Sequence, residues 1–159
     1  MDTSDYRDAL SAFPTGVAIV TSITAEGTPI GLTVSSFCSV SLDPRLVSWC
    51  IGKDSPRFWD YVNSRHFAIA VLDKEQSDLA GLFSTPVEDK FAQLQWRPGI
   101  GGVPVIEGPP VVFECINRNQ HDAGDHIILQ CEVEKFSARE IDPLVYCRGG
   151  FTQVAPAGK

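Results

Sequence analysis

Short apolar and β-branched runs, each closed by a turn signal, dominate this sequence of 159 residues. The runs lie at 15–24, 30–37, 46–51, 66–72, 111–120, 126–136 and 143–151. Such runs favour strands, and glycine, proline or aspartate between them favours tight connections. Because strands do not alternate with helices, the pattern predicts antiparallel pairing and disfavours a doubly wound parallel sheet. We expect a mainly β fold in which a closed or nearly closed antiparallel barrel removes exposed strand edges.

Helical spacing is confined to short stretches of the chain. Residues 4–13, 56–64 and 75–83 predict helices, and residues 89–94 predict one further turn. The first of these ends before Pro14, and its apolar residues predict an amphipathic helix on the outside of the body. Two hairpins are expected, one from the runs 15–24 and 30–37 and one closed by residues 122–125. Residues 95–110 predict a loop with one short strand at 103–106.

Composition excludes several classes of protein. The formal net charge of −7, with dispersed basic residues, argues against nucleic-acid binding. No apolar run is long enough to cross a membrane, and the acidic start of the sequence resembles neither a secretory signal nor a transit peptide, so a cytoplasmic location is expected. Five scattered cysteines, without zinc-binding spacing, indicate reduced thiols and no metal site.

Small hydroxyl residues interrupt the run at 31–43. Thr33, Ser35 and Ser36 follow one another there, and such side chains bind phosphate and ribityl oxygens without adding bulk. Ordinary strand residues near a bulge are an equal alternative. Lys53 and Ser55 strengthen the first interpretation, because a lysine beside a predicted helix N-terminus favours a phosphate. The two groups together predict a phosphate clamp, although Lys53 can also be a solvated loop residue.

The remaining polar candidates are His126 and Arg148. His126, facing His121 across the predicted hairpin, can orient a ligand or move a proton, or can simply cap a turn. Arg148, near Tyr146, can contact a dinucleotide phosphate or be solvated. The glycines at 99–102 lack the strand before and the helix after that a dinucleotide fingerprint requires. No GxSxG nucleophile motif occurs.

Six segments, in order, resemble the flavin reductase-like, FMN-binding split-barrel family. They are FPTGV at 13–17, GLTVSSF at 31–37 with SVS and DP up to residue 44, FAIAVL at 67–72, Gln76 with Leu79-Ala80, GDH at 124–126, and YCRGGF at 146–151. The resemblance covers nearly the whole chain. It implies one domain over 1–159, with a core of about 10–154, and a Greek-key-like split barrel.

The resemblance also implies a flavin, FMN or FAD, bound near the interface of a homodimer, with NADH or NADPH as co-substrate. The residues implied to bind the cofactors are Thr33, Val34, Ser35, Ser36, Cys50, Ile51, Lys53, Ser55, Phe83, His126, Tyr146 and Arg148. Cys50 and Ile51 would present backbone to the flavin ring, Phe83 would lie beside it, and His126 near the nicotinamide would be the catalytic residue. Arg45 replaces a frequent proline, and Gly150 replaces a common second basic residue.

The expected activity is hydride transfer from the nicotinamide to the flavin, with reduced flavin passing to a partner monooxygenase. One alternative is a flavin-binding electron carrier without nicotinamide turnover. Another is a barrel like that of pyridoxamine-phosphate oxidases, which the hydroxyl cluster, in place of an arginine-rich phosphate site, disfavours.

Overall fold

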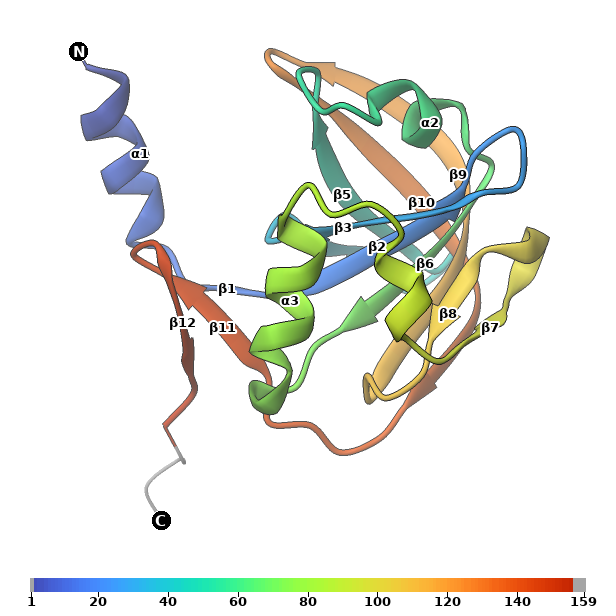
Figure 1. Ribbon diagram of the computed structural model, residues 1–159. Coiled ribbons are helices and arrows are strands. Elements are labelled where there is room, and N and C mark those ends of the chain that lie inside the picture. The colour runs from blue at the N-terminus through green and yellow to red at the C-terminus, as the bar shows by residue number, and fades with distance from the viewer. Residues whose placement is uncertain (1, 156–159) are drawn as a thin grey trace.

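The computed structural model describes residues 2–155, and its largest feature is a curled antiparallel sheet of seven strands (Figure 1). The strands lie in the order β3-β2-β6-β9-β10-β5-β4. Their bounds are β2 (Ala18–Ile23), β3 (Pro29–Val34), β4 (Cys38–Ser41), β5 (Leu46–Gly52), β6 (His66–Val71), β9 (Val111–Ala123) and β10 (His126–Ala138). The sheet is open between its outer strands, β3 and β4. The predicted fold class, a mainly β split barrel with few short helices, is confirmed.

Two small sheets complete the β structure. One has the order β1-β11-β12, with β1 (Thr15–Gly16), β11 (Leu144–Cys147) and β12 (Gly150–Gln153), and the other pairs β7 (Trp96–Pro98) with β8 (Pro104–Ile106). The single final strand predicted over 143–151 is therefore wrong, because the chain turns back there. Arg148 and Gly149 adopt φ values of 50° and 78°, which form a tight turn.

The β9–β10 hairpin is longer than predicted. Ala123 pairs with His126, so the connection is only Gly124 and Asp125, and Gly124 has the positive φ of 71° that such turns require. We expected His121 to face His126, but His121 pairs with Ile128 instead. Two-residue hairpins of this kind place the first residue of the second strand at the very end of the sheet. That is where His126 lies.

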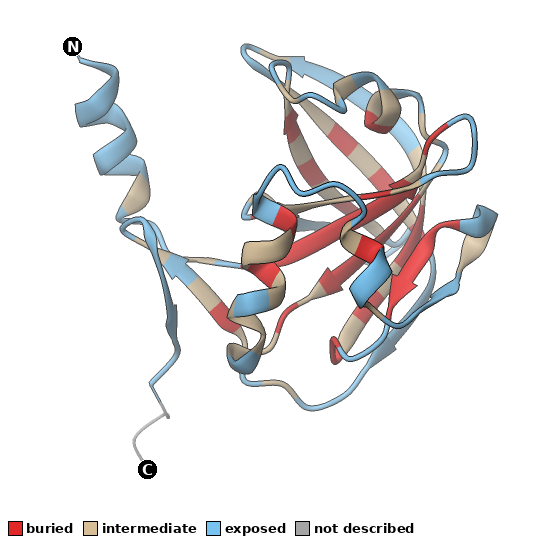
Figure 2. Cartoon of the chain, in the orientation of Figure 1, coloured by how far each residue is buried: buried red, intermediate tan, exposed pale blue. Residues whose placement is uncertain are grey.

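The helices are short and lie outside the sheet. They are α1 (Thr3–Ser11), α2 (Phe58–Asn63) and α3 (Ser77–Ser84), with 3-10 turns at η1 (Lys74–Gln76), η2 (Lys90–Gln93) and η3 (Ile100–Gly102). Contrary to expectation, α1 does not lie on the body. It stands away from the barrel in Figure 1 and contains no buried residue (Figure 2).

The core fills the barrel and continues beneath α3. Trp49, Tyr61 and Phe67 pack edge to face inside the barrel, with ring centroids 5.2–5.7 Å apart. A second cluster, which contains Phe83 and Phe91, lies between α3 and the adjoining strands. The second cluster and the contact of Phe83 with Gly31 hold α3 against β3, whose last residues belong to the predicted flavin segment.

An ion pair with a buried carboxylate attaches the β7–β8 hairpin to the sheet. The Glu114 carboxylate, 4% exposed, accepts hydrogen bonds from Arg97 at 2.9 Å and from the backbone N–H of Ile100 at 2.8 Å. Burial raises the pKa of Glu114. The two hydrogen bonds and the charges of Arg97 and Lys135 outweigh burial, so its pKa lies below the ordinary value. This pair holds residues 96–106 against the outer side of β9.

Close contact between β3 and α3 leads to a stability prediction. A Cβ added at Gly31 would lie 2.5 Å from Cε1 of the buried Phe83 ring. We expect Gly31→Ala to lower the free energy of unfolding, measured by urea denaturation, by about 1–3 kcal/mol. Gly81 in α3 is the matched control, because nothing lies within 4 Å of its added Cβ. Gly81→Ala should raise stability by about 0.5–1 kcal/mol. Equal effects of the two substitutions would contradict this packing.

Candidate functional site

A three-residue connection spans the opening between β3 and β4. The Ser36 hydroxyl within it accepts a hydrogen bond from the Cys50 N–H at 2.9 Å and donates to the Cys50 carbonyl at 3.4 Å. β4 pairs with β5 only as far as Ser48, so Ser36 replaces the missing strand partner of Cys50. The structure thus brings together Ser36 and Cys50, two of the predicted cofactor-binding residues.

These bonds correct the role predicted for the β5 backbone. The Cys50 N–H is occupied by Ser36, so it is not free to face a flavin ring. Ile51 is 1% exposed and pairs with Ile127 of β10. Because backbone groups alternate in direction along a strand, those of Ile51 point toward β10. In this structure neither residue offers a free N–H on the open side of the sheet.

Three further predicted residues are engaged in packing. Thr33 donates its hydroxyl hydrogen to the Ala80 carbonyl at 2.6 Å, so the hydroxyl joins β3 to α3 and is not a free donor. Val34 is 7% exposed and belongs to the core. Phe83, 2% exposed, packs against Phe91 and offers no ring face to a ligand in this structure, contrary to prediction. Their contribution here is to hold the end of β3 in place.

Lys53 and His126 lie together at the end of β5. The Lys53 N–H donates to the Asp125 carbonyl at 2.9 Å, and the Lys53 ammonium lies 2.9 Å from the Asp122 carboxylate. His126 Nδ1 lies 2.7 Å from the Asp125 carboxylate, and this hydrogen bond lowers the pKa of Asp125. The His126 side chain is half-exposed, and its Nε2 lies near Gly52. The structure therefore joins Lys53 and His126 in one polar group.

Ser55 does not cap a helix. The helix α2 begins at Phe58, with Arg57 as its N-terminal flanking residue, so the predicted start at residues 55–56 is wrong. Ser55 instead closes a turn, in which its N–H donates to the Gly52 carbonyl at 3.0 Å and its own carbonyl accepts from Phe58. The helix-terminus part of the predicted phosphate clamp is thereby removed, and Lys53 remains as its cation.

A cavity of about 340 Å³ lies between α1, β1 and the β11–β12 turn. Its lining residues are Arg7, Asp8, Leu10, Ser11, Phe13, Thr15, Ser35, Tyr146, Arg148 and Gly149. Three predicted residues, Ser35, Tyr146 and Arg148, thus meet here, next in sequence to Ser36. Reasoning from the sequence did not assign Arg7, Phe13 or Thr15 to the site. Phe13 and Thr15 belong to the FPTGV segment that resembles the family, so that segment could have indicated them. No sequence pattern marks Arg7 as a binding residue.

Polar groups in this cavity lack partners. The Thr15 hydroxyl is buried without a hydrogen-bond partner in the described structure. Within residues 2–155, no carboxylate lies within 4.0 Å of the guanidinium group of Arg7 or of Arg148. A buried hydroxyl without a partner is costly unless a ligand or water satisfies it. Two guanidinium groups and this hydroxyl fit a phosphate-bearing ligand such as a flavin nucleotide or nicotinamide dinucleotide.

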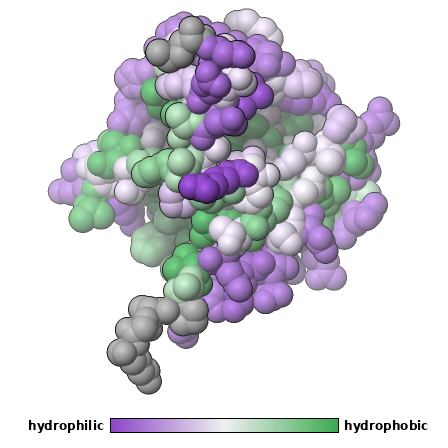
Figure 3. Space-filling model, turned by 90° about the vertical axis from the view of Figure 1, so that its left-hand side faces the viewer, coloured by the Kyte–Doolittle hydropathy of each residue, from purple (hydrophilic) through white to green (hydrophobic). Residues whose placement is uncertain are grey.

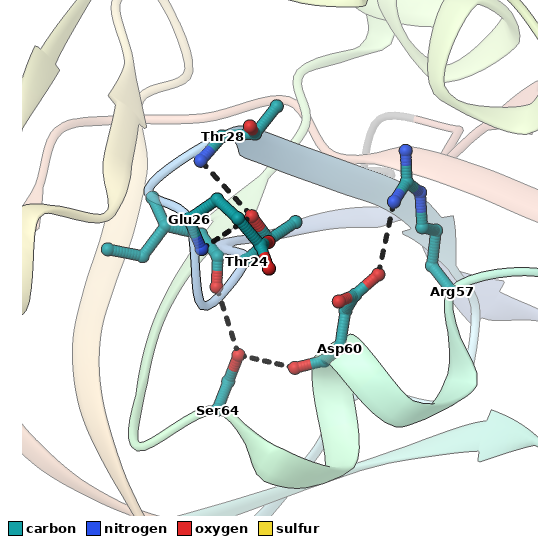
Figure 4. A network of polar contacts seen from close by, with 7 residues as sticks. Thr24, Glu26, Thr28, Arg57, Asp60 and Ser64 are labelled. Atoms are coloured by element: carbon teal, nitrogen blue, oxygen red, sulfur yellow. Dashed lines mark hydrogen bonds and ion pairs between the residues drawn. The ribbon is translucent and has the colours of Figure 1, made fainter.

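A second cavity, of about 320 Å³, lies beside α2 and the β2–β3 turn. Polar contacts lie along one side of it, where Ser64 donates to the Asp60 carbonyl at 2.6 Å and Asp60 pairs with Arg57 (Figure 4). Thr24 accepts hydrogen bonds from the N–H groups of Glu26 and Thr28 in the adjoining turn. None of the predicted site residues lines this cavity.

Two classes of site find no support in the part of the chain that the structure describes. Residues 2–155 contain no cluster of three or more His, Cys, Asp or Glu side chains placed to bind a metal ion. No helix in the same range has both the length and the apolar character to cross a membrane.

Comparison with known proteins identifies relatives of this chain. The family of flavin reductase like domains matches residues 10–155. The chain is 46% identical over 150 residues to an FMN reductase (NADH) of Agrobacterium fabrum, covering 94% of this chain and 85% of that protein. It is 42% identical over 147 residues to the reductase component of a flavin-dependent trigonelline monooxygenase of Acinetobacter baylyi, covering 92% of this chain and 47% of the relative.

The similarity extends to solved structures. An NADH:FAD oxidoreductase of Streptomyces globisporus, solved in complex with NAD and FAD fragments, superposes with a TM-score of 0.92 at 32% identity. That comparison covers 99% of this chain and 96% of the other. Against the Acinetobacter protein and a probable flavin reductase of Rhizobium meliloti, however, the chain spans only about half the relative's length, 47% and 51%.

The bond between Ser36 and Cys50 generates a prediction. Ser36→Ala removes the acceptor of the Cys50 N–H, so we expect the free energy of unfolding to fall by about 1–2 kcal/mol. Hydrogen exchange of the Cys50 amide, followed by NMR, should accelerate in the same variant. Ser35 is the control, since its exposed side chain makes no hydrogen bond within residues 2–155. Ser35→Ala should change stability by less than about 0.5 kcal/mol. Unchanged exchange at Cys50 in Ser36→Ala would contradict the assignment.

Proposed function

The chain belongs to the family of flavin reductase like domains, and on that basis we propose that it transfers a hydride from NADH or NADPH to FMN or FAD. The observation that carries the proposal is the convergence of Ser35, Tyr146 and Arg148 on one cavity, adjacent in sequence to Ser36. The relatives' names support it, because they include an FMN reductase (NADH) and an NADH:FAD oxidoreductase.

Lys53 and Arg148 are the cations that we assign to the phosphates of the two ligands. Lys53 now pairs with Asp122 in an exposed contact, a pairing that is weak enough to be exchanged for a phosphate. The exposed ring of Tyr146 supplies an aromatic surface, and the free hydroxyls of Ser35 and Thr15 supply hydrogen bonds. When bound, the flavin and the nicotinamide supply the hydride chemistry themselves.

His126 is the residue that we assign to the reaction. Its Nδ1 is engaged by Asp125, and this contact fixes the ring while leaving Nε2 near Gly52 at the end of β5. A ring held in this way can donate a hydrogen bond to the carboxamide of the nicotinamide or support the reduced flavin. No covalent catalyst is required, so the contribution of the protein is to orient two planar ligands and to exclude water.

We also infer a homodimer, with α1 covered by the second copy. Tyr6, Leu10 and Phe13 are 56–76% exposed, and a nine-residue helix is marginal in water unless its apolar face is packed. Apolar and polar patches alternate on the face that α1 occupies (Figure 3). Tyr146 and Phe151 extend the apolar surface on the adjoining hairpin. A second copy of the chain would bury this surface beside the cavity.

The proposal extends to the setting of the enzyme. The Acinetobacter relative is the reductase component of a monooxygenase, and by analogy we propose that reduced flavin passes from this protein to a partner oxygenase. We propose a cytoplasmic location, where NADH is available and thiols remain reduced. We also propose that residues 1–159 form one domain with its core at about 10–154.

A flavin-dependent assay tests the activity. Purified protein mixed with NADH and free FMN or FAD should oxidise NADH only when flavin is added. His126→Ala should slow stopped-flow flavin reduction at least tenfold while changing flavin affinity by less than about twofold. His121→Ala, on the same hairpin, is the control and should behave as the wild type. A tightly bound flavin without NADH oxidation would identify an electron carrier instead.

Sedimentation equilibrium tests the dimer. The wild-type protein should sediment at twice the 17.3 kDa of the chain. Tyr6→Glu places a charge in the proposed interface and should shift the equilibrium toward the monomer, because burying an unpaired carboxylate is unfavourable. Val87→Glu, at another exposed apolar residue, should leave the dimer intact. A wild-type monomer at micromolar concentrations would overturn the inference.

A further inference from the structure

We propose that Arg7 of α1 acts with Arg148 as a two-cation clamp for the pyrophosphate of the nicotinamide dinucleotide. The inference rests on the proposed function, and it adds a binding residue from a helix that the sequence presents only as an exposed surface element. Arg7 and Arg148 come from opposite ends of the chain and line the same cavity. Two guanidinium groups facing one cavity can bind two adjacent phosphates, since each guanidinium forms bidentate hydrogen bonds.

Backbone contacts hold together the two segments that carry these arginines. The Arg148 N–H donates to the Ser11 carbonyl at 2.8 Å, and the Cys147 thiol lies 3.7 Å from the same oxygen. Ser11 is the last residue of α1, one helical turn after Arg7. The β11–β12 turn is thus attached to the end of α1, and Arg148 holds a left-handed φ of 50° there. This attachment brings Arg148 to the same cavity as Arg7.

The charges around the cavity favour a ligand with more than one negative charge. The chain carries a net charge of −7, yet both guanidinium groups lie outside the ion pairs formed within residues 2–155. One carboxylate, Asp8, also lines the cavity and repels anions. A single negative charge therefore gains little there, whereas a pyrophosphate with two charges can engage both arginines. The unpartnered hydroxyl of Thr15 adds a hydrogen-bond donor.

Arg7 also accounts for a departure in the sequence. The family resemblance implies a second basic residue at the position of Gly150, so the β11–β12 turn carries Arg148 as its one cation. In this structure the second cation reaches the cavity from α1 instead. Lys53 belongs to a separate group at the end of β5, where Asp122 and Asp125 surround it. The two groups divide the phosphates between them, with the flavin phosphate assigned to Lys53 and the dinucleotide pyrophosphate to the arginines.

Binding of ADP-ribose tests the clamp independently of turnover, because this probe contains the pyrophosphate but no nicotinamide. Calorimetry with the full chain should show about tenfold weaker binding to Arg7→Gln and to Arg148→Gln than to the wild type. Arg7→Lys should restore part of the affinity, since it keeps the charge without the bidentate geometry. Arg65→Gln, at an exposed arginine on the other cavity, is the control and should bind normally.

Steady-state kinetics separate this inference from the proposed function. In Arg7→Gln the loss in kcat/KM for NADH should arise from KM, with flavin affinity and sedimentation behaviour as in the wild type. Unchanged ADP-ribose affinity in Arg7→Gln would overturn the clamp, and so would a loss confined to flavin affinity. A wild-type protein that binds ADP-ribose through Arg7 but oxidises no NADH would overturn only the proposed function.

Discussion

The structure depends on how the chain closes the opening between β3 and β4. An open curled sheet leaves two strand edges whose N–H and C=O groups need partners. Here the closing element is a connection of three residues, and the Ser36 hydroxyl takes the place of a strand by bonding both backbone groups of Cys50. A side-chain hydroxyl suits this position because it donates and accepts at once. The same connection carries Ser35 to the cavity, so closure of the barrel and construction of the site share one segment.

A second constraint joins the two ends of the chain. β1 pairs with β11, and the bond from Arg148 to Ser11 attaches the final hairpin to α1. The cavity therefore combines residues 7–15 and 146–149, from the two ends of the chain, with Ser35 from the connection between β3 and β4. The polar group around Lys53 and His126 depends instead on the β5–β10 pairing, which is part of the main sheet. The cavity thus depends on contacts between the two ends of the chain, whereas the polar group around Lys53 and His126 depends on the main sheet.

Sequence patterns predicted the elements better than the directions of their side chains. Alternation, turn residues and helical spacing identify most of the strands and the three short helices, because those patterns are local. The orientation of Thr33 toward Ala80 and the burial of Phe83 under Gly31 are set by the packing of α3 on β3, which no local pattern records. The helix start at Phe58, and not at Ser55, likewise reflects the turn that precedes it. Arg7 could not be recognised, because an arginine on an exposed helix has the pattern of a solvated residue.

The hydroxyl residues of the segment 31–43 have two different structural roles. Thr33 and Ser36 use their hydroxyls to hold β3 to α3 and the connection to β5, so they make the segment rigid. Ser35 alone keeps an exposed side chain on the cavity. The hydroxyl cluster, predicted to supply donors to one ligand, therefore mainly stabilises the structure. The negative charge of a ligand must be balanced by cations from other segments. In a chain with a net charge of −7, those cations act only at short range, which favours a ligand that enters the site over one that binds the surface.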